Sequence, residues 1–95
     1  MRGVFLSDLH HAACALRAFP QQYRVDLACI AIMQARCADR YRKAHGRVHP
    51  HWGNGSLSGV FGPVDAPDRC DRAYLDAMAA IIAALMAENS ADGRN

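Results

Sequence analysis

Apolar residues recur every three or four positions along most of the chain, and no stretch alternates strictly between apolar and polar residues. A spacing of three and four places side chains on one face of a helix, whereas a half-buried strand alternates. Three segments with this spacing are predicted to be helices: 6–19, 20–45 and 68–89. The pattern therefore predicts an all-α fold, a single helical domain over residues 1–95.

The first helix is expected to begin at Ser7, a good N-cap residue, with Asp8 in its first turn against the positive helix end. Pro20 should end this helix and suits the first turn of the next one. The apolar face of the first helix consists of residues at helical spacing: Leu9, Ala12, Ala13, Leu16 and Phe19.

The second helix is apolar over more than one face, and Gly46 is expected to end it. A stripe of larger residues, widened by Val25, Ile32 and Met33, comprises Tyr23, Leu27, Ile30, Cys37 and Tyr41. A helix with so wide an apolar surface usually has neighbours on two sides. The second neighbour is either another helix of this chain or another subunit.

A long loop, 46–67, is predicted before the last helix because it has no apolar period and contains five of the seven glycines and three of the four prolines. Irregular connections of this length are often functional or poorly ordered. The last helix should start near Pro67 or Asp68, with Asp71 in its first turn, and the tail 90–95 is expected to be frayed.

The net charge of +2 is too small to indicate nucleic-acid binding, but the charge is unevenly distributed. Residues 36–51 carry five basic side chains and one acid, a local charge of +4. The basic residues are Arg36, Arg40, Arg42, Lys43 and Arg47. They are interpreted either as the solvated end of a helix, where the dipole favours cations, or as contacts to phosphates or an acidic protein surface.

His49 and His51 follow this basic segment and are candidate binding residues with it. No general base stands at a fixed offset from them, as it would in HExxH. The residues around them are typical of a structured loop: Pro50, Trp52, Gly53, Asn54 and Gly55. A rigid, self-packed loop is favoured over a partner-binding loop or a catalytic one.

The four cysteines form no CxxC pair and are interpreted as small buried apolar side chains: Cys14, Cys29, Cys37 and Cys70. A metal site using His10 or His11 with Cys14 is the alternative, but no recognised ligand spacing supports it. No catalytic residue, metal or cofactor is therefore assigned. No apolar run approaches the ~20 residues of a membrane span, and the start is unlike a signal peptide, so a cytoplasmic protein is expected.

The sequence resembles a family of small bacterial proteins associated with the packaging region of phage-like gene transfer agents. The resemblance is carried by Ser7-Asp8-Leu9, by Ala38-Asp39-Arg40-Tyr41-Arg42-Lys43, by the HPxWGNGSL run from His49 to Leu57, and by Tyr74-Leu75. It implies a small terminase, a non-catalytic oligomeric adaptor that brings double-stranded DNA to the large terminase ATPase. No catalytic residues carry over, because that role has none.

The chain is too short for the usual three-part plan of small terminases, which begins with a DNA-binding helix-turn-helix. Its second helix is apolar where a recognition helix presents polar side chains to bases. Weak, non-specific DNA contact is therefore expected rather than sequence reading. Two alternatives are kept: a helical regulatory or assembly protein that binds only proteins, and a metal-dependent enzyme that uses His45, His49, His51 and a cysteine.

Overall fold

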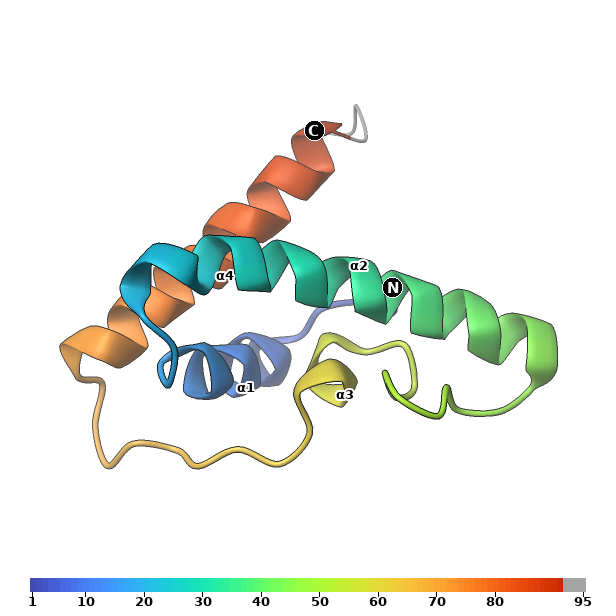
Figure 1. The fold of residues 1–95 in the computed structure, drawn as a ribbon, viewed down its shortest axis with the longest axis horizontal. Coiled ribbons are helices and arrows are strands. Elements are labelled where there is room, and N and C mark those ends of the chain that lie inside the picture. Colours follow the sequence, from blue (N-terminus) through green and yellow to red (C-terminus); the bar gives the residue numbers. More distant parts are fainter. Residues whose placement is uncertain (92–95) are drawn as a thin grey trace.

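The computed structural model describes residues 1–91, and these form four helices (Figure 1). In chain order they are α1 (Leu6–Leu16), α2 (Gln21–His45), α3 (Leu57–Phe61) and α4 (Arg72–Ala91). The long helix α2 crosses α4, and α1 and the short α3 lie next to each other beneath α2 in the view of Figure 1. The predicted all-α fold is confirmed, with one helix more than predicted.

Helix α1 begins at Leu6, and its capping side chain is Asp8 rather than the expected Ser7. Phe5 occupies the N-cap position with an extended backbone, and its N–H donates to Oδ2 of Asp8 at 2.9 Å. The carboxylate thus satisfies a backbone donor that the helix leaves free, while Ser7 lies inside the first turn. The helix ends at Leu16, so Phe19 lies beyond it and is largely exposed.

Helix α2 begins after Pro20 and ends before Gly46, the two residues expected at its ends. Pro20 precedes Gln21 with φ −56°, and Gly46 follows His45 with φ 67°. The left-handed conformation of Gly46 lets its N–H donate to the carbonyl of Arg42 at 2.8 Å, which closes the last turn. Local chemistry accounts for both ends.

The buried face of α2 consists mainly of alanine rather than of the stripe of large residues. Its core positions are Ala28, Ala31, Ile32, Ala35 and Ala38. Two residues of that stripe, Tyr23 and Ile30, are 52% and 45% exposed. Helix α4 has a similar arrangement, since Ala77, Ala80 and Ala84 are buried while Leu75 and Met86 are exposed. Small side chains let the helices approach closely, so tertiary packing here favours alanine over larger residues.

The predicted loop 46–67 is interrupted by helix α3, which corrects the three-helix prediction. The side chain of Ser56 caps this helix by accepting a hydrogen bond from the Gly59 N–H at 3.1 Å. Leu57, at the first position, is buried in the core between α1 and α2. Five residues are too few to establish an apolar period, which is why the pattern showed no helix here.

Helix α4 begins at Arg72 rather than at residue 68. The carboxylate of Asp71 accepts a hydrogen bond from the Tyr74 N–H at 2.8 Å, so Asp71 caps the helix instead of lying in its first turn. The preceding segment 62–71 runs as an irregular connection along the outside of the molecule (Figure 1). The predicted frayed tail 90–95 begins inside α4, and its residues 92–95 lie outside the described residues.

Arg24 joins three helices and was not singled out by the sequence. Its buried guanidinium donates to the carbonyls of Leu16, Arg17 and Phe19, all at the C-terminal end of α1, at 3.0–3.1 Å. It also pairs with Asp76 of α4 at 2.7 Å. One side chain thus satisfies backbone acceptors that α1 leaves open and ties α1 and α2 to α4.

The cysteine interpretation holds for Cys14, which is buried, but is wrong for the exposed Cys29 and Cys70. Cys37 is half-buried, and all four thiols are free. Within residues 1–91, no helix is both long and apolar enough to cross a membrane.

Candidate binding surface at the end of helix α2

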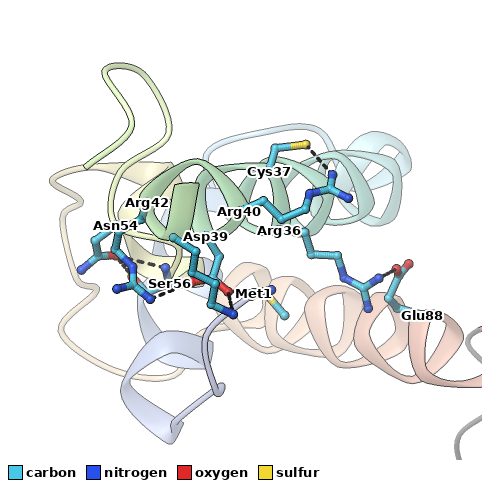
Figure 2. A network of polar contacts seen from close by, with 10 residues as sticks. Met1, Arg36, Cys37, Asp39, Arg40, Arg42, Asn54, Ser56 and Glu88 are labelled. Atoms are coloured by element: carbon cyan, nitrogen blue, oxygen red, sulfur yellow. Dashed lines mark hydrogen bonds and ion pairs between the residues drawn. The ribbon is translucent and has the colours of Figure 1, made fainter. Parts of the chain in front are cut away.

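The basic segment is organised around the buried carboxylate of Asp39. This carboxylate pairs with the guanidinium of Arg42 at 3.0 Å, the ammonium of Lys43 at 3.1 Å and the amino group of Met1 at 3.6 Å (Figure 2). Hydrogen bonds from Arg42 and then Lys43 lower the pKa of Asp39 from 3.8 to about 2. Because one carboxylate is shared by three cations, this end of α2 keeps an excess of positive charge.

Arg36, Arg40 and Lys43, which helical spacing places near one face of α2, have different partners. Arg36 forms an ion pair with Glu88 of α4 at 2.8 Å, and Arg40 donates to the sulfur of Cys37 at 3.4 Å. Figure 2 shows Arg36 extending toward Glu88 and Arg40 toward Cys37, while Lys43 pairs with Asp39. Arg36 therefore links the helices, and the more accessible positive charge lies on Arg40, Lys43 and the loop residue Arg47, all of which are exposed.

The start of the loop is a tight turn built on His49. Its Nδ1 accepts hydrogen bonds from the backbone N–H groups of His51 at 3.0 Å and Trp52 at 3.1 Å. The backbone N–H of His49 donates to the Gly53 carbonyl at 3.0 Å, which closes the turn. Since Nδ1 must carry a lone pair to accept these bonds, the ring proton of neutral His49 is on Nε2.

Aromatic rings hold this turn to α2. The His49 ring stacks on Trp52 with centroids 4.8 Å apart and planes 4° from parallel. Tyr41 of α2 meets His49 edge-on at 4.8 Å and also contacts His45 at 4.4 Å. Trp52 is connected to α2 through the His49 ring. His51 lies on the exposed side of the turn, where its ring is 5.9 Å from that of His49.

Two glycines of the loop have left-handed backbones and close neighbours. Gly53 has φ 81°, and a Cβ atom there would lie 2.7 Å from the carbonyl oxygen of Gly59. Gly55 has φ 93°, and its Cβ would lie 2.8 Å from Cα of Asp39. Any larger residue at either position would therefore be strained and would also collide with backbone. These contacts explain why glycine is required at both positions.

The rest of the HPxWGNGSL run forms the start of α3 and fastens it to α1. The Asn54 side-chain oxygen accepts from the Ser56 hydroxyl at 2.6 Å and from its N–H at 3.0 Å. Further along, the Ser58 hydroxyl donates to Asp8 at 2.6 Å. Burial raises the pKa of Asp8, but hydrogen bonds from Ser58 and the Phe5 backbone outweigh this and leave it below its usual value. The run and the start of α3 thus pack between α1 and α2 and hold them together.

A second cluster of side chains that could take part in chemistry lies between α1 and α4. His10 contacts the sulfur of Cys14 through Nε2 at 3.6 Å and the hydroxyl of Tyr74 through Nδ1 at 2.8 Å. Burial raises the pKa of Tyr74. Among the described residues, no group of three or more His, Cys, Asp or Glu side chains is arranged to hold a metal ion. These contacts fasten α1 to α4.

The geometry defines a class of protein. It is a small all-helical protein in which a loop held by its own side-chain hydrogen bonds packs on the positively charged end of the longest helix. The chain belongs to the family described as Domain of unknown function (DUF7742), whose model matches residues 2–85. No curated protein and no solved structure matches the chain.

Proposed function

We propose that this protein is a non-catalytic DNA-packaging adaptor that resembles a small terminase and acts in the cytoplasm. In this role it self-associates and connects double-stranded DNA with a large terminase ATPase. The proposal originates in the sequence resemblance and draws structural support from the surface at the end of α2.

The observation that carries the DNA-binding part is the charge around Asp39. This carboxylate meets three cations, and the side chain of Lys43 remains 69% exposed while it pairs. Arg47 lies nearby on the exposed loop and, in the part of the chain that the structure describes, makes no ion pair. Flexible cations at a helix end suit phosphates, which carry no sequence information. The contact is therefore weak, sensitive to salt and independent of DNA sequence.

Fluorescence anisotropy of labelled double-stranded DNA tests this part. The double variant K43E/R47E should reduce DNA affinity at least tenfold at low salt, because it replaces two phosphate-binding cations with anions. The matched control is R69E/R72E, which makes the same charge change on exposed arginines at the start of α4. Equal losses in both double variants would show a general charge effect, and unchanged binding by K43E/R47E would overturn the assignment.

The adaptor part is tested by co-purification with a large terminase ATPase. A complex that survives washing at moderate salt supports the proposal. A large terminase that is neither bound nor stimulated in its ATPase activity contradicts it.

The second candidate is an assembly protein that binds only protein, and exposed apolar side chains favour it. Twelve large hydrophobic residues in the described part are at least 37% exposed, including Phe5, Leu75 and Met86. Where such side chains form one continuous patch, they are typical of protein contact surfaces. A stable complex with one protein partner, together with no DNA binding at low salt, would favour this candidate over the packaging adaptor.

A further inference from the structure

The outward face of α2 carries both apolar and charged residues. It lies opposite the alanine face, and Met33 at its centre is 57% exposed. Residues on this face at helical spacing around Met33 are Asp26, Cys29, Ile30, Cys37 and Arg40. All of them are exposed except Cys37, which is half-buried. This set is called the outer face of α2.

The outer face is complementary to itself when two copies run antiparallel. Positions four residues before and after Met33 are Cys29 and Cys37, and positions seven residues before and after are Asp26 and Arg40. A twofold axis through Met33 exchanges each position with its counterpart. Asp26 then lies opposite Arg40 of the partner subunit, and Cys29 lies opposite the partner subunit's Cys37.

The charges exclude the parallel arrangement. In parallel register Asp26 would face Asp26 of the partner subunit, and Arg40 would face the partner subunit's Arg40, which places like charges together. Asp26 makes no ion pair within residues 1–91, and the Arg40 guanidinium contacts a thiol rather than a carboxylate. Both charges are therefore available to an antiparallel partner.

We propose that a second copy of this chain packs antiparallel on the outer face of α2, with Met33 on the twofold axis. Two Asp26–Arg40 ion pairs, one at each end, set the register between the subunits. This dimer specifies how the self-association in the proposed function is arranged. Its biological role rests on the proposed function, but its geometry does not.

The cysteines provide a test of the register. With helix axes about 8–10 Å apart and Cα atoms about 2.3 Å from each axis, directly facing Cα atoms lie roughly 3.4–5.4 Å apart, and the wider spacings in this range suit a disulfide. Diamide, which takes up the two thiol hydrogens as the S–S bond forms, should convert the full-length protein to a covalent dimer on a non-reducing gel.

The variants C29S and C37S should each lose this cross-link, and a mixture of the two should regain it. The matched control C70S, which removes another exposed cysteine, should cross-link as the unmodified protein does. A covalent dimer formed equally well by C29S or C37S alone would overturn the antiparallel register, since a parallel pair keeps like cysteines together.

Charge exchange provides a second test that needs no oxidation. By sedimentation equilibrium, D26R and R40D should each weaken the dimer at least tenfold, and D26R/R40D should restore most of the loss. Single variants that dimerise normally, a double variant that stays weak, or a strict monomer at high concentration would overturn the proposal. The K43E/R47E variant should dimerise normally, so failure of the dimer and failure of DNA binding are separable.

Discussion

Gly55 lies so close to Asp39 that a single methyl group would not fit between them. A Cβ atom on Gly55 would be 2.8 Å from both Cα and Cβ of Asp39. The Gly55 carbonyl also accepts a hydrogen bond from the Arg2 N–H at 2.9 Å. The N-terminal segment, the loop and α2 therefore meet at the carboxylate around which the basic side chains gather.

The first prediction concerns this contact. The variant G55A should destabilise the protein by more than the roughly 1–2 kcal/mol that a left-handed backbone alone costs a residue with a Cβ atom. The reason is that it adds a collision with α2 to that strain. The matched variant G46A has a similar backbone, with φ 67°, but open space around its Cβ atom. Urea unfolding followed by circular dichroism should rank G55A below G46A, and equal losses would show that the close approach is unimportant.

The second prediction concerns the response to acid. The folded protein keeps Asp39 ionised at a pH where the unfolded chain has already bound a proton, because its pKa is about 2 instead of 3.8. Asp39 therefore favours folding above about pH 4, and this contribution disappears as the pH falls toward 2. The variant D39N should be less stable near neutrality and should lose less stability on acidification.

The control for this experiment is D68N, which removes an exposed carboxylate that has no ion pair within the described range. It should follow the unmodified protein at every pH. Part of the acid response should remain in D39N because the pKa of Asp8 is also lowered. Parallel stability curves for D39N and the unmodified protein between pH 4 and 2 would contradict the assignment.

The third prediction concerns Arg24. The conservative variant R24K should cost about 3 kcal/mol in the free energy of unfolding, because an ammonium cannot reach the carbonyls at the end of α1 and Asp76 together. The control is R17K, since the Arg17–Asp71 pair is longer, at 3.8 Å, and partly exposed. It should change stability by less than about 1 kcal/mol. A small effect of R24K would mean that water replaces the guanidinium at these carbonyls.

Local signals in the sequence account for the all-α fold and for the ends of α2. Pro20 and Gly46 act through their own backbone preferences, so their effect can be predicted without tertiary information. The packing faces could not be predicted in this way, because large apolar residues outweigh alanine in any apolar pattern. Whether Ile30 or Ala31 is buried depends on how closely α2 and α4 approach, which is a property of the assembled fold.

The candidate site was located by its charge, but its internal pairing was not predictable. Five basic residues near one acid mark the end of α2 in the sequence. The partner of Arg36 is Glu88, which is far away along the chain, and Met1 reaches Asp39 only after folding. Arg24 carried no signal because its partners are mostly backbone carbonyls, which are the same for every residue type.

The alanine-lined interior also affects how stability depends on temperature. The heat capacity change of unfolding reflects mainly the apolar surface that becomes hydrated, and typical domains give about 12–15 cal/mol/K per residue. Alanine contributes one methyl group, and the largest fully buried side chains in the described part are Leu16, Ile32, Leu57 and Ile81. Calorimetry of the monomer should therefore give a value below the usual range, with a correspondingly flat stability curve.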